Sequence, residues 1–388
     1  MSLGSFESLS NVFKGVSKVS IVYSMDPESI ICASMLANFA SFKELDFELA
    51  PFYIAEKPID GSTLVLLVGV RQQRVVGGLR VKLLWDLVES KKFLAIKLTK
   101  ELREIWVVSP EQIAMSIAAT MASYPGPSYS DAILSALRSE LSELVSAGIV
   151  SLSEKSLRVF RYPNAKISEC LFRTLEPFIP GVSLSREGAK RLVEELGIPD
   201  RKGVLEEEEK RKLVESLRGA LRDSVLKPVD VEGWKAVVRG VENVDLNELC
   251  YALLAAIDAD LHELCLATLF KFGYCSAIMG LLERSYDYIA QFVEEASRGE
   301  KKVGRMYIRG VKVHQVEAEE GAPLNVLSKM LKAHGLADGV VVFRIGERYC
   351  VPLSDASPSW PMEKVEGIEF VRGCACSTVM DKLIRVLV

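Results

Sequence analysis

The stretch that decides the fold is Val19-Ser20-Ile21-Val22-Tyr23-Ser24-Met25-Asp26-Pro27-Glu28. Its first five residues are a short, mostly β-branched and apolar run, which predicts a buried strand. Asp26 suits a helix N-cap, Pro27 the first helical position and Glu28 the positive end of the helix dipole. A strand that leads directly into a helix indicates an α/β unit, and we expect this helix to end near Phe42.

The same alternation of short apolar runs and helical segments continues to about residue 147, which is typical of an α/β fold. Ser109-Pro110-Glu111-Gln112 repeats the helix-start signal, with Gln112 placed to close a capping box. Because the predicted strands are mostly apolar, we expect a parallel sheet covered on both faces. Strands are predicted at 47–53, 64–68, 80–85 and 105–108, and further helices at 110–123 and 131–147.

Beyond residue 150 the pattern changes to helices separated by proline and glycine, and then to a second mixture of helices and strands. The charged run at 206–212 is typical of a solvated helix face with i,i+4 pairs, with an interaction tail as the alternative. The predicted elements are a strand at 157–160, a charged helix at 205–225, a linker at 227–230, helices at 246–258, 261–272, 280–296 and 323–334, and strands at 303–316, 339–345, 348–352 and 368–371. We therefore expect domains at 1–150, 151–226 and 227–388.

Composition narrows the class of protein. The 388 residues are 49% hydrophobic and 26% charged, which is typical of a folded chain long enough for two or three domains. The formal charge of −4 provides no overall basic field for a polyanion, so any nucleic-acid contact requires a local patch. Apolar runs such as 64–68 are far shorter than the ~20 residues that span a bilayer, and the N-terminus lacks a signal-peptide pattern. We expect a cytoplasmic protein without membrane contact.

The eight cysteines are interpreted as thiols, because no Cys-x-x-Cys pair is present and a cytoplasmic protein rarely keeps disulfides. The pattern therefore argues against a structural zinc site and a disulfide framework. Cys374-Ala375-Cys376 is the one close pair. We interpret it as two small buried residues on a strand or loop, with a redox or metal half-site as the alternative.

Several common catalytic motifs are absent from the sequence. It contains neither Gly-x-Gly-x-x-Gly nor a P-loop, and its three histidines, His262, His314 and His334, stand in no His-Glu-x-x-His context. One cluster gathers carboxylates and an imidazole, in Asp258-Ala259-Asp260-Leu261-His262-Glu263. On one helix these side chains would point in different directions. We therefore expect a break between two helices here, with a metal site as the alternative.

Three segments resemble, in chain order, the first three motifs of the DHH phosphoesterase superfamily, in its branch of archaeal RecJ-like proteins: Ser24-Met25-Asp26-Pro27-Glu28-Ser29 after the first strand, Leu67-Val68-Gly69, and Leu84-Trp85-Asp86-Leu87-Val88. Farther along, 174–183 and 194–198 are similar to the Pro-x-x-Pro-Gly-Ile-Ser and Glu-Leu-Gly-Ile stretches between the two domains of that branch. The likeness covers nearly the whole chain. It implies an N-terminal DHH-like parallel-sheet domain, a helical connector and a smaller DHH-associated C-terminal α/β domain.

The motifs depart from those of active family members at the metal ligands. Active members resemble one another in a His-x-Asp-x-Asp-Gly loop, an Asp after the second strand and an Asp-His-His, because two divalent cations need several carboxylates and imidazoles. Here Val22, Ser24 and Leu67 replace ligands, and Leu87-Val88 replaces the two histidines. The remnants are Asp26 and Asp86, and Asp26 already has an explanation as an N-cap. The resemblance therefore implies a site that has lost its metals and holds no cofactor.

The C-terminal part departs in a similar way. Family members bind single-stranded substrate with a Gly-Gly-Gly-His type loop, whose backbone amides reach phosphate. This chain has Val371-Arg372-Gly373-Cys374-Ala375-Cys376-Ser377 at that place. Arg372 and Gly373 are the remaining candidates for nucleic-acid binding, and a surface arginine without such a role is the alternative.

The resemblance and the lost ligands together imply a catalytically inactive scaffold of the archaeal replication machinery. They point to the branch that contains the Cdc subunit of the CMG replicative helicase and the GINS-associated nuclease. The implied partners are the GINS complex and the MCM helicase, with single-stranded DNA as a further candidate. One alternative is a metal-dependent single-strand exonuclease or phosphodiesterase that uses Asp26 and Asp86, or the Asp258 cluster. A stand-alone single-strand-binding module is the other, and the absence of a basic stripe disfavours it.

Overall fold

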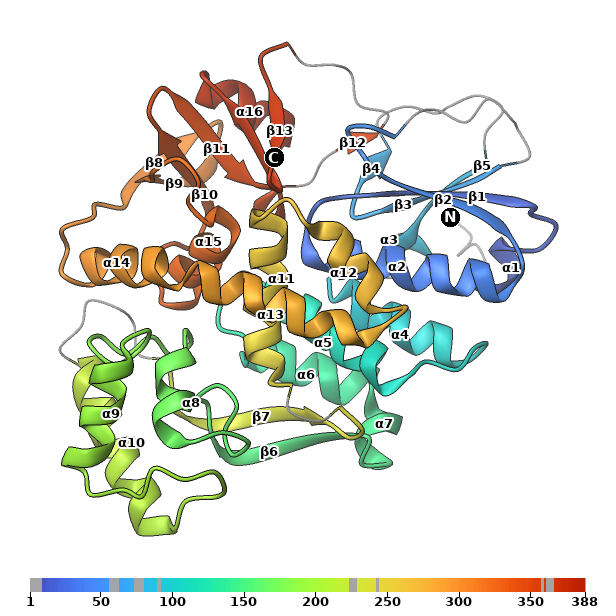
Figure 1. Cartoon of the computed structure of the whole chain (residues 1–388). Coiled ribbons are helices and arrows are strands. Elements are labelled where there is room, and N and C mark those ends of the chain that lie inside the picture. The colour runs from blue at the N-terminus through green and yellow to red at the C-terminus, as the bar shows by residue number, and fades with distance from the viewer. Residues whose placement is uncertain are drawn as a thin grey trace.

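The N-terminal part of the chain is built on a parallel sheet of four strands, in the order β2-β1-β3-β5 (Figure 1). The computed structural model describes residues 9–55, 63–72, 80–88, 92–222, 229–241, 244–356, 359–360 and 366–387. β1 (Lys18–Tyr23) pairs with β2 (Asp46–Pro51) on one side and with β3 (Leu64–Val68) on the other, and β5 (Arg80–Leu83) lies outside β3. Every residue of β3 is buried, as in a sheet covered on both faces. The predicted α/β fold class is confirmed.

Two helices of this part begin where the sequence predicts. α2 (Pro27–Phe42) is capped by Asp26, and α5 (Pro110–Ser123) begins with the capping box of Ser109 and Gln112. Both caps satisfy backbone N–H groups that the first turn of a helix leaves without partners. The other helices of the N-terminal part are α1 (Leu9–Val12), α3 (Leu84–Leu87), α4 (Leu94–Arg103), α6 (Asp131–Glu140) and α7 (Ser142–Ser146).

The strand predicted at 105–108 is wrong, because these residues form a turn and a loop between α4 and α5. Trp106 lies 6.1 Å, between ring centroids, from both Phe39 and Phe42 of α2, and Val107 is 84% exposed. The apolar pattern therefore reflects packing on a helix and not a place in the sheet. The strand predicted at 80–85 also ends early, since α3 begins at Leu84.

The middle of the chain combines a two-stranded antiparallel sheet with three helices. β6 (Val150–Leu157) pairs with β7 (Glu232–Val238). The sequence pattern does not predict β7, and the strand that it predicts at 157–160 lies later in the chain than β6 does. The helices are α8 (Ile167–Arg173), α9 (Arg186–Glu195) and α10 (Glu207–Arg222). The expected domain boundary at 226, and the first half of the expected linker at 227–230, lie outside the described residues.

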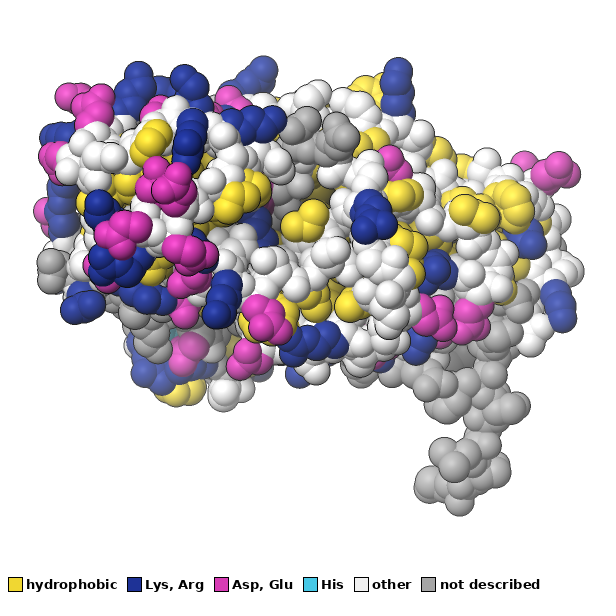
Figure 2. All heavy atoms as spheres, turned by 90° about the horizontal axis from the view of Figure 1, so that it is seen from below, with side chains coloured by type: hydrophobic (Ala, Val, Ile, Leu, Met, Phe, Trp, Pro, Cys, Tyr) yellow, Lys and Arg dark blue, Asp and Glu magenta, His cyan; other side chains and the backbone are white. Residues whose placement is uncertain are grey.

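Charged side chains are concentrated on this middle part. In α10 Arg211 pairs with Glu208 at 2.8 Å and with Glu215 at 3.1 Å, which confirms the predicted solvated face. Figure 2 shows the contrast from below: charged side chains crowd the left of this face, whereas on the right they are sparser and exposed hydrophobic side chains lie between them.

The C-terminal part begins with four α-helices and a short 3-10 helix and ends with a mixed sheet of six strands in the order β13-β14-β11-β10-β9-β8. A helix, α15 (Leu324–Ala333), connects β9 to β10, which are parallel. The preceding helices are α11 (Leu246–Asp258), α12 (His262–Thr268), η1 (Phe272–Tyr274), α13 (Cys275–Arg284) and α14 (Tyr286–Ser297). The strands are β8 (Gly304–Ile308), β9 (Val311–Glu317), β10 (Val340–Ile345), β11 (Arg348–Pro352), β13 (Glu369–Val371) and β14 (Cys374–Ser377), with the 3-10 helix η2 (Leu353–Asp355) after β11 and α16 (Met380–Leu387) at the end.

The interpretation of all eight cysteines as thiols is wrong. Cys350 of β11 and Cys376 of β14 are directly opposite each other in the antiparallel register and form a disulfide. Sequence reasoning missed the pair because the two residues are 26 positions apart and only the strand register brings them together. Cys374 is a free, buried thiol on β14, as expected of a small residue on a strand.

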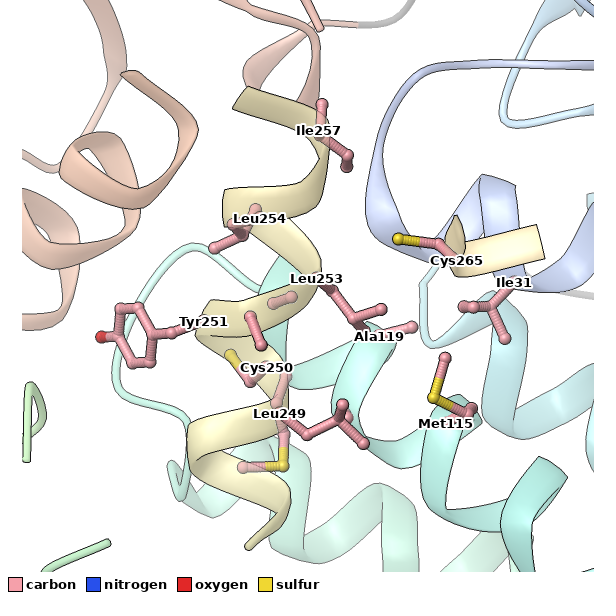
Figure 3. Close-up of a cluster of buried hydrophobic side chains, with 14 of the residues drawn as sticks. Ile31, Met115, Ala119, Leu249, Cys250, Tyr251, Leu253, Leu254, Ile257 and Cys265 are labelled. Carbon is pink, nitrogen blue, oxygen red and sulfur yellow. The ribbon is translucent and has the colours of Figure 1, made fainter. Parts of the chain in front are cut away.

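α11 is the centre of the core that joins the N- and C-terminal parts. All of its 13 residues are buried, as in a helix surrounded by other elements. Figure 3 shows Leu249 and Leu253 pointing toward Met115 and Ala119 of α5, while Tyr251 points to the opposite side. Among the described helices, none is long and apolar enough to cross a membrane.

Candidate functional site

Asp26, the remnant of the first motif, lies between the end of β1 and the start of α2. Its Oδ1 accepts hydrogen bonds from the backbone N–H of Ser29 at 3.0 Å and from the hydroxyl of Ser123 at 3.4 Å. Its Oδ2 accepts from the Ser29 hydroxyl at 2.5 Å. Burial raises the pKa of the Asp26 carboxyl, although these hydrogen bonds oppose the shift. The predicted N-cap role is confirmed.

Glu28 is a second carboxylate beside Asp26, and the sequence analysis assigned it only to the helix dipole. Its Oε1 accepts from the Thr120 hydroxyl at 2.7 Å and from the backbone N–H of Ala95 at 3.0 Å, so it joins α2 to α5 and α4. Its own backbone N–H donates to the Ser123 hydroxyl at 3.1 Å. Burial raises the pKa of Glu28 to about 7, and the neighbouring Asp26 charge acts in the same direction.

The second motif places a glycine next to Asp26 and Ser29. Gly69, with φ +65°, follows β3, and a Cβ atom built on it would lie 1.9 Å from the Ser29 hydroxyl oxygen and 3.2 Å from Asp26 Oδ2. A side chain at this position would displace Ser29 and strain the backbone. Leu67, which stands for the second-motif ligand, is fully buried in β3. β3 therefore supplies no carboxylate to the cluster.

Asp86, the other remnant, is not part of the cluster. It is an exposed residue of α3, which follows β5, whereas Asp26 follows β1. Because β3 lies between these two strands, the strand ends are two spacings apart, roughly 10 Å. No hydrogen bond or ion pair between described residues joins the two carboxylates.

The donor set at this place does not fit the pair of divalent cations that the fold family implies. Over the described part of the chain, no group of three or more His, Cys, Asp and Glu side chains is arranged to hold a metal. The Asp26 oxygens instead accept hydrogen bonds from the amide and hydroxyl groups that form the helix cap. A two-metal site needs bridging and terminal ligands whose lone pairs are free.

A buried lysine fixes the C-terminal part next to this cluster. Lys329 of α15 is 4% exposed, and its Nζ donates to the backbone carbonyls of Met121, Tyr124 and Gly126 at 2.6, 3.0 and 2.7 Å. These carbonyls belong to the last turn of α5 and the loop after it, where the negative end of the helix dipole favours a cation. Burial lowers the pKa of Lys329. The three carbonyl oxygens replace the water molecules that its ammonium group would bind in solution.

Two further contacts join the same two parts. Phe370 of β13 stacks on Tyr53, after β2, with ring centroids 5.0 Å apart and an interplanar angle of 4°, and meets Phe52 edge-on at 5.3 Å. β4 (Arg71–Gln72), after β3, pairs in parallel with β12 (Ser359–Trp360) of the C-terminal part. The two parts are therefore connected by side chains and by backbone.

A cleft of about 920 Å³ remains between the two parts, and Ser123 of the carboxylate cluster lies on its wall. The lysines on the opposite wall are neutralised, because Lys312 pairs with Asp338 and Lys332 pairs with Asp355. Hydrogen bonds from Lys312 and from His314 lower the pKa of Asp338 to about 2. These lysines are therefore already engaged by carboxylates and do not form a basic channel for a phosphate backbone.

The predicted nucleic-acid residues lie in a tight turn between β13 and β14. Arg372 is exposed, with φ +50°, and Gly373 is buried, with φ +65°. A Cβ atom on Gly373 would lie 2.0 Å from Cγ2 of Ile257, so this glycine permits close packing on α11. Its carbonyl accepts from the backbone N–H of Leu353 at 2.8 Å. Gly373 thus has a packing role, and nucleic-acid binding by Arg372 and Gly373 stays a prediction.

The Asp258 cluster is divided between two helices, as predicted. Asp258 ends α11 and accepts from the backbone N–H groups of Asn325 and Val326 at 2.9 and 3.1 Å, so it caps α15. Burial raises the pKa of Asp258 to about 7, against these hydrogen bonds. His262 begins α12, and its Nδ1 lies 3.6 Å from Glu263. Asp258 is thus used within the fold.

Comparison with known proteins identifies relatives of the fold. The crystal structure of CDC45 from Entamoeba histolytica matches with a TM-score of 0.57 and 9% identity, over 88% of this chain and 85% of that chain. Two RecJ structures match with a TM-score of 0.39: RecJ with Mn²⁺ from Thermus thermophilus, at 12% identity over 97% of this chain and 52% of that one, and exonuclease RecJ bound to manganese, at 13% identity over 99% and 93%. No protein-family model and no curated protein sequence matches. The CDC45 likeness confirms, for the fold, the predicted resemblance to RecJ-like proteins.

Proposed function

We propose that the chain is a non-catalytic RecJ-like scaffold subunit of the archaeal DNA replication machinery, which binds the GINS complex and the MCM helicase. Single-stranded DNA is a further partner in this proposal. The observation that carries it is the state of Asp26, whose carboxylate oxygens are occupied by Ser29 and Ser123 and which faces Gly69. The fold similarity to CDC45 supports the choice of machinery.

The contacts between the N- and C-terminal parts support a scaffold. Lys329 donates to three backbone carbonyls at the end of α5. The Phe370–Tyr53 stack and the β4–β12 pair connect the same two parts at other places. An enzyme that admits a polymer between two domains gains from their relative motion. A scaffold gains from a fixed geometry, because partners then meet a preorganised surface.

Two experiments test the proposal. The purified chain is mixed with purified GINS and with purified MCM, and complexes are sought by size-exclusion chromatography at several salt concentrations. The same preparation is incubated with labelled single-stranded DNA and RNA in Mn²⁺ and in Mg²⁺. We expect a complex with each protein and no cleavage above that of a buffer control.

The alternative enzyme has its own signature. Metal-dependent cleavage that disappears in Asp26→Asn, and persists in a control variant such as Asp287→Asn on the exposed surface of α14, would overturn the non-catalytic assignment. A chain that cleaves nothing and binds neither GINS nor MCM would overturn the replication assignment while leaving the fold as described.

A further inference from the structure

β8 is an edge strand of the six-stranded sheet and has no neighbour on its outer side among the described residues (Figure 1, upper left). It forms a hairpin with β9 through the turn Arg309-Gly310, whose φ angles of +51° and +81° are those of a two-residue hairpin turn. In such a hairpin Ile308 and Val311 form the first hydrogen-bonded pair, and the pairing alternates from there. The backbone N–H and C=O groups of Arg305 and Tyr307 therefore point away from β9.

These outward groups are accessible. Within the described chain, no hydrogen bond uses the N–H of Arg305 or of Tyr307, and the Tyr307 side chain is 65% exposed. Proteins commonly protect such an edge with proline, a bulge, a covering loop or charged side chains, and β8 contains neither proline nor a shift of register, with Arg305 as its one charged residue. An edge whose backbone groups stay accessible is a template for one more strand.

A groove of about 750 Å³ lies beside this edge, between the end of α14 and the face of β8 and β9. Met306 forms part of its floor, and four glutamates against two lysines line it. Lys301 is already paired with Glu295 at 3.3 Å, whereas the carboxylates of Glu300 and Glu319 have no ion-pair partner in the described chain. The groove therefore carries more carboxylate than ammonium groups.

We propose that β8 accepts an extended basic segment of a partner protein, which adds a seventh strand to the sheet. Backbone groups of Arg305 and Tyr307 would pair with that segment. Because cross-strand neighbours share a face, every second side chain of the segment would point to the groove of Glu300 and Glu319, and there Lys or Arg fits best. The intervening side chains would lie beside Tyr307, where apolar or aromatic residues fit.

A second copy of this chain is a poorer occupant. Pairing β8 with β8 of another molecule around a two-fold axis would bring two acidic grooves to the same face of the joined sheet. Like charges across such an interface are unfavourable, whereas a basic segment neutralises them.

This inference rests on the proposed scaffold function in one respect, namely that the partner is a protein. It is tested separately from that function. The full chain is immobilised and presented with a displayed library of random twelve-residue peptides. We expect enriched sequences with Lys or Arg at every second position and apolar or aromatic residues between them. Enrichment of no sequence, or of sequences without this alternation, would overturn the proposal.

Variants of the edge then test the backbone contact with an enriched peptide. Tyr307→Pro removes one outward N–H without removing a bond to β9, and we expect binding to weaken by about tenfold or more. Tyr307→Thr keeps the N–H and is the matched control, with an expected change of about threefold or less. Glu300→Lys with Glu319→Lys is expected to weaken binding by about tenfold, and Glu347→Lys, on an exposed turn of the same domain, is its control.

The peptide itself provides a test that does not depend on how a variant folds. Two synthetic peptides carry N-methyl groups on alternate residues, in the two possible phases. Only one phase blocks the hydrogen-bonding edge that faces β8, so we expect one peptide to lose binding and the other to keep it. Equal binding of both peptides, or dimerisation of the chain through β8 instead, contradicts the proposal. If no peptide binds β8 but the chain binds GINS, only this inference is overturned. If a peptide binds β8 as expected but the chain binds neither GINS nor MCM, only the proposed function is overturned.

Discussion

Two buried carboxylate clusters in this molecule are stabilised in different ways. Where the middle part contacts α11, the fully buried Glu248 receives the guanidinium groups of Arg161 and Arg173, each at 2.6 Å. At the start of α2, Asp26 and Glu28 receive only hydroxyl and backbone N–H donors. The first cluster thus contains its own cations and the second contains none.

Burial raises the pKa of Glu248 as well as those of Asp26 and Glu28. Two guanidinium groups oppose the shift at Glu248, whereas only neutral donors and the helix dipole oppose it at Asp26 and Glu28. A metal site would use the same oxygens as ligands. Here Ser29, Thr120, Ser123 and the backbone N–H of Ala95 use them to join α2, α5 and α4. The residues that resemble the first motif thus form a structural contact.

The largest effect is expected at the cationic cluster. Arg173→Met leaves Glu248 buried with one partner fewer, and Arg173 also pairs with Glu169 and Glu283. Removing one partner of a buried ion pair costs about 3–5 kcal/mol of folding free energy. Urea unfolding monitored by circular dichroism measures the change.

The double variant Arg173→Met with Glu248→Gln is the control for this first prediction. It removes the buried charge along with its partner, so we expect it to be more stable than Arg173→Met alone. A double variant as unstable as the single one would show that lost packing, and not an uncompensated charge, causes the effect.

Local signals in the sequence predict the helix cap formed by Asp26, but they do not predict the residues that contact Glu28. Asp26 and Pro27 are neighbours in the chain, and their cap is predictable from spacing alone. Glu28 meets Thr120 and Ala95, which are 92 and 67 positions away, so no short pattern contains the contact. Tertiary packing decides such pairs, and for the same reason the apolar run at Trp106 predicts a strand that does not form.

The same limit applies to the strands of the middle and C-terminal parts. β6 is mostly polar and exposed, and its apolar alternation does not continue past Ser153, so the pattern that identifies a strand is incomplete. Its paired residues in β7 lie 75 to 88 positions away. Cys350 and Cys376 meet only because β11 and β14 are neighbours in the sheet. Helix caps are therefore predictable here, and long-range pairing is not.

Glu28→Gln tests the uncompensated charge of the second cluster. The folded pKa of Glu28, about 7, is above its unfolded value of 4.5, so the unfolded chain releases the proton first and stability is lost as pH rises from about 4.5 to 7. The amide of the variant does not titrate. We expect the wild type to lose about 2 kcal/mol relative to Glu28→Gln between pH 5 and pH 8. Urea unfolding of both proteins at the two pH values measures it, and a difference that does not change with pH would contradict it.

Ser123→Ala has a smaller expected effect. It removes the hydroxyl that accepts from the Glu28 N–H and donates to Asp26. The loss of a hydrogen bond of this kind costs about 1 kcal/mol. Ser139→Ala, at an exposed position of α6, is the matched control and should change stability by less than about 0.5 kcal/mol. Thermal unfolding of the two variants compares them, and equal effects would mean that Ser123 does not stabilise the cluster.

The smallest expected effect is the response of the second cluster to Mn²⁺. A cation that binds only the folded chain must raise its melting temperature with concentration. Because the Asp26 oxygens are already engaged by Ser29 and Ser123, we expect Mn²⁺ and Mg²⁺ to leave the melting temperature unchanged, in the wild type and in Asp26→Asn alike. Calorimetric scans over a metal titration measure this, with Ca²⁺ as a control for ionic strength. A rise with Mn²⁺ in the wild type that Asp26→Asn abolishes would show that the cluster still binds a metal, and the contrast with the arginine cluster would then be one between two kinds of cation.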